Sequence, residues 1–197
     1  MKEYTITRCT SQPDWENVPT LDIDYLMETS PSSIRAQGQL CYDENALYVR
    51  LRAVEADIRA EHTGLLDEVC EDSCLEFFFC PMAGDSRYFN IEINPNGAMF
   101  LGFGSNADTL VRLITEDVIC PTVTRTADGW EVTYAIPYAF VRRFFPDFAP
   151  TAGSSMRANC YKCGELTPLA HFLCWNPVPF QSCAFHNPDA FGVMHFE

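Results

Sequence analysis

The sequence predicts an all-β domain, an antiparallel two-sheet β sandwich of about ten strands with one or two short helices. Three observations support this fold class. Hydrophobic residues alternate with polar ones at a period of two in several segments, which is the spacing of a half-buried strand. Turn-forming residues are spread evenly through the chain. The helical segments are too short to cross between parallel strands, so antiparallel pairing should dominate.

The first clear strands, residues 34–42 and 46–54, should form a hairpin around the turn Asp43-Glu44-Asn45. In the second strand, the hydrophobic residues at 47, 49, 51 and 53 alternate with Tyr48, Arg50 and Arg52. This alternation predicts one buried and one wetter face.

The segment 71–79 should form a central strand. Residues 73–80, SCLEFFFC, are nearly all apolar, as expected for a strand covered on both faces, and Pro81 ends the run because proline cannot donate to a strand ladder. Within this run, Glu76 is the one charged residue.

The next strand, residues 87–94, places Phe89, Ile91 and Ile93 on one face. The turn at residues 94–97 leads into a strand at 98–103. Further strands are expected at residues 121–126, 130–136, 156–161, 171–175 and 191–196. A short helix is expected at 138–145, and 57–67 has room for a turn or two.

The length of the chain indicates how many domains it forms, and its net charge excludes some classes of partner. A chain of 197 residues fits a single β-sandwich domain over 1–197. The net charge of −14 would repel nucleic acid and anionic membranes, so we expect neither as a partner, and a neutral ligand is favoured. The sequence does not indicate an oligomeric state.

The N-terminus carries no apolar stretch typical of a secretory signal, and no window is long and apolar enough to span a membrane. We therefore expect the chain to be cytoplasmic as given, or extracellular if it is a mature or excised fragment. In a reducing compartment the ten cysteines are thiols. The lone CxxC of Cys160 and Cys163, with Cys70 and Cys74 as a weaker pair, favours core packing over a metal site.

Polar side chains follow two strands at alternate positions. One row is Tyr88, Asn90, Glu92 and Asn94, and the other is Arg157, Asn159 and Tyr161. If these rows lie beside Glu76, together with Arg50 and Arg52, they form a face suited to hydrogen bonding with vicinal hydroxyls. Trp175 and the tyrosines could stack on a sugar ring. The pattern therefore indicates sugar binding.

Several alternatives stay open. Glu76 and Glu92 could instead pair with Arg50, Arg52 or Arg157 across strands. The two glutamates could also be the acid and nucleophile of a small glycoside hydrolase, which needs two carboxyls about 5 to 10 Å apart. A third alternative is a polar face that docks onto a partner protein.

His186 is the one histidine expected to contact a ligand, because it lies in the loop 185–189 and loops often carry binding residues. The alternative for His186 is an Asn-Pro turn in which the imidazole hydrogen-bonds its own backbone.

Taken in order, these segments resemble family 9 carbohydrate-binding modules and the wider DOMON-like sandwich group. The resemblance runs through nearly the whole chain and is carried by residues 45–49, 71–78, 88–94 with Gly97, 129–132, 136–137, 157–159, Trp175 and 191–192.

The resemblance implies a jelly-roll-like sandwich that binds sugars, often with structural calcium and often as an accessory module of an enzyme. It implies that a sugar lies between two tryptophan rings. Trp175 matches one ring, whereas the other falls near Cys70, where this chain has no tryptophan. Glu76 matches the carboxylate after the acidic turn, and Asn90 or Glu92 supplies polar contacts from the next strand.

The predicted function is therefore that of a non-catalytic sugar-binding module for a mono- or oligosaccharide. The predicted ligand-binding residues are Glu76, Tyr88, Asn90, Glu92, Arg157, Asn159, Trp175 and His186.

Overall fold

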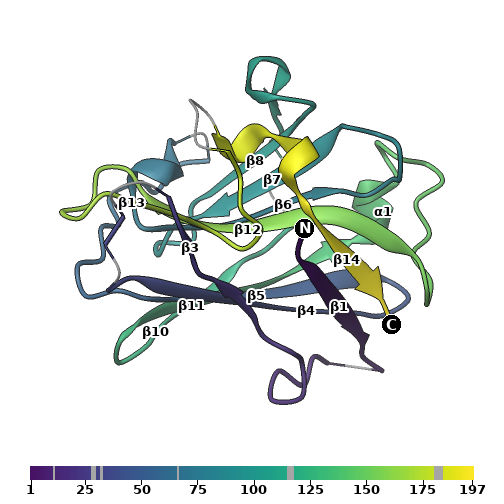
Figure 1. Ribbon diagram of the computed structural model, residues 1–197, viewed down its shortest axis with the longest axis horizontal. Coiled ribbons are helices and arrows are strands. Elements are labelled where there is room, and N and C mark those ends of the chain that lie inside the picture. Colours follow the sequence, from purple (N-terminus) through teal and green to yellow (C-terminus); the bar gives the residue numbers. More distant parts are fainter. Residues whose placement is uncertain (11, 28–29, 32, 66, 115–117, 180–183) are drawn as a thin grey trace.

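The computed structural model describes residues 1–197 except 11, 28–29, 32, 66, 115–117 and 180–183. The described residues form fourteen strands, one short α-helix and four short 3-10 helices (Figure 1). The longer strands are β1 (Glu3–Arg8), β4 (Arg35–Tyr42), β5 (Ala46–Val54), β6 (Cys74–Cys80), β7 (Tyr88–Ile93), β8 (Met99–Gly104), β11 (Gly129–Pro137), β12 (Ser155–Gly164) and β14 (Gly192–Phe196). The shorter elements are β2 (Leu21–Ile23), β3 (Tyr25–Leu26), β9 (Val111–Arg112), β10 (Thr122–Arg125), β13 (His171–Cys174), α1 (Tyr138–Val141), η1 (Val69–Glu71), η2 (Ala107–Thr109), η3 (Ala184–His186) and η4 (Pro188–Ala190).

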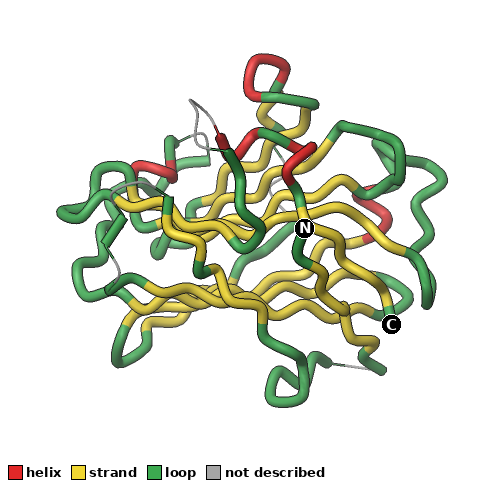
Figure 2. The backbone as a smooth tube through the Cα atoms, viewed as in Figure 1, coloured by secondary structure: helices red, strands yellow, loops and turns green. Residues whose placement is uncertain are grey.

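The strands form one large curled sheet, in the order β10, β11, β5, β4, β1, β14, β12, β6, β7, β8, β9. β2 pairs with β4, and β13 pairs with β12 and β3. Figure 2 shows the strands in two layers, with most loops at the ends of the layers. The predicted all-β class with few helices is confirmed.

The sheet is mixed, because β1 pairs in parallel with both of its neighbours. Its first half lies beside β14, with Tyr4 opposite Met194, and its second half lies beside β4, with Thr7 opposite Cys41. The other strand pairs are antiparallel. The expected arrangement of two separate antiparallel sheets is therefore not confirmed, since one strand joins the two halves.

The main core lies between the two halves of the curled sheet. Val49 and Leu51 of β5 belong to the same buried cluster as Phe77 of β6 and Ile91 of β7. Each of these side chains is fully buried. The period-two pattern therefore directs one face of each strand into the core and leaves the opposite face for other contacts.

Local predictions agree with most of these elements. The hairpin of β4 and β5 pairs along its whole length, and β6 lies between β12 and β7 with every residue buried. β6 begins at Cys74 rather than Glu71, because Val69–Glu71 forms a 3-10 turn.

The predicted helix at 138–145 is the shorter α1, Tyr138–Val141. The described part of 57–67 holds no helix. Its backbone N–H groups at Glu61 and His62 donate to Asp72, and those at Thr63 and Gly64 donate to Asp67. None of the helices in the described part of the chain has the length and apolar character needed to cross a membrane.

Candidate functional site

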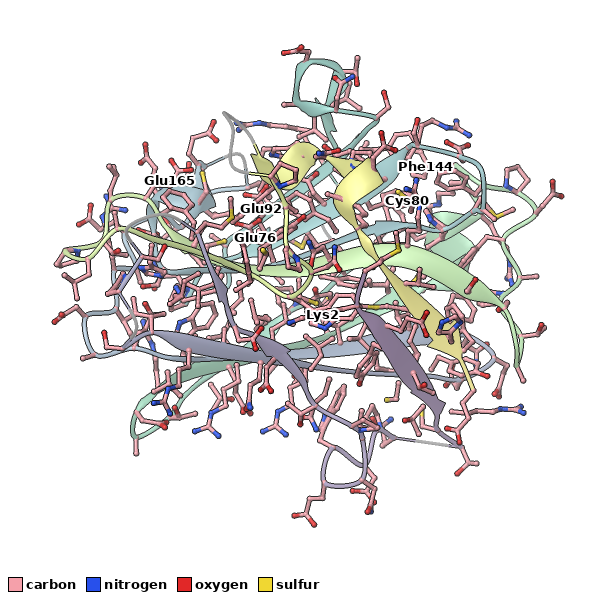
Figure 3. The ribbon with its side chains drawn as sticks, in the orientation of Figure 1. Lys2, Glu76, Cys80, Glu92, Phe144 and Glu165 are labelled. Carbon is pink, nitrogen blue, oxygen red and sulfur yellow. The ribbon has the colours of Figure 1, made fainter. Side chains whose placement is uncertain are left out.

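The candidate site lies on the face of β12, β6, β7 and β8 that points away from the main core, which we call the outer face. Alternation along β6 and β7 places Glu76, Asn90 and Glu92 here, because Phe77 and Ile91 point into the core. Glu76 is directly opposite Glu92, and Phe78 is opposite Asn90. Figure 3 shows the Glu76 and Glu92 side chains close together on the upper layer of strands.

The second predicted polar row also reaches this face. On β12, Tyr161 is opposite Glu76 and Asn159 is opposite Phe78. Arg157 is opposite Cys80. The structure therefore brings together the two rows that the sequence could only place on separate strands, and β6 runs between them.

The predicted arginines do not pair with these glutamates in the described part of the chain. Arg50 and Arg52 lie on the other half of the sheet, where they bind Glu131 at 2.6 Å and Asp128 at 2.8 Å. Arg157 donates to the backbone oxygen of Pro188 at 3.0 Å. The interpretation of Glu76 and Glu92 as cross-strand partners of an arginine is therefore wrong.

Glu76 and Glu92 instead have uncharged hydrogen-bond partners. The Cys163 thiol donates to Glu76 Oε1 at 2.9 Å, and the Asn90 amide donates to Glu92 Oε1 at 2.7 Å. Burial raises the pKa of Glu76, and burial together with the adjacent Glu76 carboxylate raises the pKa of Glu92. A protonated carboxyl group both donates and accepts hydrogen bonds, as a hydroxyl group on a ligand requires.

Asn159 and Arg157 hold the C-terminal segment onto this face. The Asn159 amide nitrogen donates to Asn176 O at 2.9 Å, and Asn159 Oδ1 accepts from Asn176 N at 2.8 Å. Arg157 binds Pro188 O as described above, and its ion-pair distance to Asp189 is 3.8 Å. These two residues therefore position the segment around the site, and Arg157 Nη1 and both polar atoms of the Asn159 side chain already have protein partners.

Tyr88 and His186 form a hydrogen-bonded aromatic pair. The Tyr88 hydroxyl lies 2.8 Å from His186 Nδ1, and the His186 ring is 5.2 Å from that of Phe78. Burial lowers the pKa of His186, which keeps the imidazole neutral at pH 7. This pair borders the site on the side of Phe78 and Asn90.

Trp175 does not lie on the outer face. It is 3% exposed and belongs to the main core cluster. Its ring packs on Gly192, where an added Cβ would be 2.5 Å from a Trp175 ring atom. The expectation that Trp175 stacks on a sugar does not fit this position, because residue 175 continues the core-facing alternation of His171 and Leu173 on β13.

Phe185 is an aromatic ring on this face that the sequence analysis did not identify. It is half-buried and stacks on Tyr161, with ring centroids 4.0 Å apart and an interplanar angle of 17°. It also packs against the cluster that contains Cys74, Phe100 and Cys163. Phe185 follows no strand periodicity, and its position beside the aromatic His186 in a loop is the only signal that could have indicated it.

Around the outer end of the site lie further polar groups that the sequence analysis did not assign. Arg112 of β9 lies over the Phe100 ring at 4.6 Å and forms an ion pair with Glu68. Glu165, which Figure 3 labels near Glu92, lies at the solvent-exposed edge of the site. Partial burial of its carboxyl raises the pKa of Glu165. The site thus carries several acidic groups.

Asp72, in the acidic turn before β6, does not fit the structural calcium that the family resemblance implied. Calcium needs free carboxylate and carbonyl oxygens. Asp72, however, accepts from the backbone of Glu61 and His62, from Asn94 and from Arg59. The group of three ligand atoms found within 4.8 Å of one another among the described residues is that of Cys74, Glu76 and Cys163, which includes two sulfurs.

The glutamate pair also lacks the arrangement of a glycoside hydrolase. Directly opposed residues on neighbouring strands have Cβ atoms about 4.5 to 5.5 Å apart and point to the same side. Glu76 and Glu92 are opposed in this way and are 2% and 7% exposed. Both carboxyls therefore lie on one side of any sugar that reaches this face, whereas the hydrolytic reaction needs them to flank the scissile bond.

A family model described as "Carbohydrate-binding family 9" matches residues 13–196. Among solved structures, a candidate carbohydrate-binding protein from Bacteroides uniformis is 25% identical, with a TM-score of 0.85, and the match covers 100% of this chain and 99% of that one.

A family 9 carbohydrate-binding module from Caldicellulosiruptor kristjanssonii, solved with glucose, is 14% identical, with a TM-score of 0.72, and the match covers 100% of this chain and 96% of that one. A structure of such a module from the same organism with cellotriose is 14% identical, with a TM-score of 0.71 and coverages of 100% and 94%. These two likenesses show the fold alone. No curated protein matches this chain.

Proposed function

Because this chain belongs to carbohydrate-binding family 9, we propose that it binds a mono- or oligosaccharide without catalysing its cleavage. The observation that carries the proposal is the polar group of Glu76, Asn90 and Glu92 on a buried sheet face, with no arginine partner among the described residues. Buried polar groups are costly unless a partner satisfies them. A ligand with several hydroxyls would supply such partners.

The hydrogen-bonding capacity of this group suits sugar hydroxyls. Asn90 Oδ1 is buried and has no hydrogen-bond partner among the described residues. The carboxyls of Glu76 and Glu92 each use one oxygen in the hydrogen bonds given above, and each carboxyl offers a second oxygen. A pair of adjacent sugar hydroxyls can both donate to and accept from such groups.

In this proposal Phe185 takes the stacking role expected of Trp175. Its ring lies above Tyr161, which is directly opposite Glu76 in the sheet. An aromatic face beside a polar group matches the two sides of a pyranose ring, one apolar and one edged with hydroxyls. Glucose and cellotriose are the first ligands to test, because family 9 modules of the same fold were solved with them.

The test is isothermal titration of the reduced protein with glucose, cellotriose and a panel of other neutral sugars, in the presence of a metal chelator. Phe185→Ala should weaken binding about two- to tenfold, from a lost aromatic contact of about 0.5–1.5 kcal/mol. Glu92→Ala should weaken it by about tenfold, the value of one or two hydrogen bonds.

The matched control is Glu131→Gln, which changes a carboxyl on the other half of the sheet, where Glu131 pairs with Arg50. This variant should bind sugar like the wild type. If folded wild-type protein binds no sugar in the panel, or if Glu131→Gln weakens binding as much as Glu92→Ala, the proposed site is wrong.

A further inference from the structure

Two thiols and a carboxyl group converge on the outer face beside the proposed sugar site. Cys74 of β6 is directly opposite Cys163 of β12, and Glu76 is two residues further along β6 on the same face. The two Sγ atoms and a Glu76 carboxylate oxygen all lie within 4.8 Å of one another, and all three residues are buried. The pairing of β6 with β12 creates this group, since 89 residues separate Cys74 from Cys163 in the sequence.

We propose that Cys74, Cys163 and Glu76 bind one thiophilic divalent cation, with Zn²⁺ as the best match. Zinc prefers cysteine sulfur at about 2.3 Å and carboxylate oxygen at about 2.0–2.2 Å in a tetrahedral arrangement. That geometry places the two sulfurs roughly 3.8 Å apart and each sulfur roughly 3.6 Å from the oxygen. The Cys74 sulfur therefore needs to move by at most about 1 Å towards the other two ligand atoms. Cys163 Sγ and Glu76 Oε1, which are 2.9 Å apart, need to separate by about 0.7 Å.

The charge of this region also favours a cation. Glu76 faces Glu92 directly, and the two thiols become anionic when they bind metal. Lys162, the neighbour of Cys163 in the sequence, points to the opposite face, where it binds Glu55 at 3.2 Å and His171 at 2.7 Å. Its charge acts through the sheet to lower the pKa of Glu76 and Cys74, against the larger effect of burial, but it donates no hydrogen bond to either side chain among the described residues. A dication bound to the three ligands would relieve the repulsion between the buried carboxylates.

Three protein ligands leave one tetrahedral position open for water or another oxygen ligand. The sulfur donors distinguish this site from calcium and magnesium sites, which are built from oxygen atoms. The inference does not rest on sugar binding, although both proposals use Glu76.

The test uses the full chain, reduced with a phosphine and freed of metal, and titrates it with Zn²⁺ and Co²⁺ in the absence of sugar. One equivalent should bind. The Co²⁺ form should show sulfur-to-metal charge-transfer absorption, which requires thiolate ligands. Free Zn²⁺ at about a hundred times its Kd should raise the Tm by about 5–10 °C.

Cys74→Ala and Cys163→Ala should each abolish or strongly reduce the charge-transfer band and weaken metal binding at least tenfold. The matched controls are Cys80→Ala, on the same face of the same strand, and Cys160→Ala, whose side chain lies in the main core. Both controls should keep the band and the affinity of the wild type.

Glu76→Gln provides a variant of nearly unchanged shape in case a cysteine variant does not fold. It should keep the sulfur charge-transfer band but bind metal at least tenfold more weakly. A folded wild-type protein without the band, or an equal loss in Cys80→Ala, would overturn the inference. The sugar titrations are run in the presence of a metal chelator. A protein that binds no sugar would therefore contradict the proposed function but not the proposed metal site.

Discussion

The buried ion pair of Glu55 and Lys162 offers a quantitative test of how this core is held together. Glu55 directly follows β5 and its side chain is 2% exposed, and Lys162 on β12 is fully buried. Glu55 accepts hydrogen bonds from Trp130 Nε1 at 2.6 Å and from the Ser73 hydroxyl at 2.9 Å. Lys162 Nζ also donates to Cys163 O at 2.8 Å and contacts His171 Nε2 at 2.7 Å.

Replacing Lys162 by Met removes the cation but keeps a side chain of similar length. Glu55 then stays buried with two neutral donors and no counter-charge, which costs about 3–5 kcal/mol. This loss is a large part of a typical unfolding free energy of about 5–15 kcal/mol. For a domain of this size, it corresponds to a fall in Tm of about 6–20 °C.

The assay is a double-mutant cycle by urea unfolding with Lys162→Met, Glu55→Gln and the double variant. The double variant should recover at least about 1 kcal/mol relative to the sum of the single losses, because it leaves no unpaired charge. Arg52→Met is the matched control, since its ion pair with Asp128 is exposed and should contribute about 0–1 kcal/mol. If Lys162→Met loses no more than Arg52→Met, or if the double variant is strictly additive, this explanation is refuted.

Two further predictions concern stability. Trp175→Ala should destabilise the fold by about 3–5 kcal/mol, because it leaves a cavity in the core. The folded variant should bind sugar with an affinity within about twofold of the wild type. If titrations show a larger loss of affinity in the folded variant, Trp175 contacts the sugar and this prediction is wrong. Burial, followed by Lys162, lowers the pKa of His171 to about 4, so the unfolded chain takes up a proton that the folded chain excludes as the pH falls from about 6.5 to about 4. The contribution of the neutral imidazole to stability is therefore complete above about pH 6.5 and is lost towards pH 4. In urea unfolding, the free energy of unfolding of His171→Gln should fall by about 2 kcal/mol less than that of the wild type between pH 7 and pH 4.5. An equal pH dependence in the two proteins would contradict this prediction.

Side-chain alternation along single segments was enough to predict most of the strands. The pairing of β4 with β5 needs only a short turn between two segments of period-two alternation. It can therefore be predicted from the local sequence. The parallel pairing of β1 with β14 and β4 could not be predicted in this way. It joins residues that are 190 positions apart for β14 and 34 positions apart for β4.

The same distinction applies to the site. Alternation within β7 places Asn90 and Glu92 on one face, and the apolar run of β6 makes Glu76 conspicuous, so both features follow from local sequence. The tertiary structure decided that Glu76 faces Cys163 and Glu92 rather than an arginine, that Trp175 turns into the core, and that Phe185 covers Tyr161. These outcomes depend on which strands become neighbours and which face each one buries, and burial of the apolar surface of the whole chain determines both.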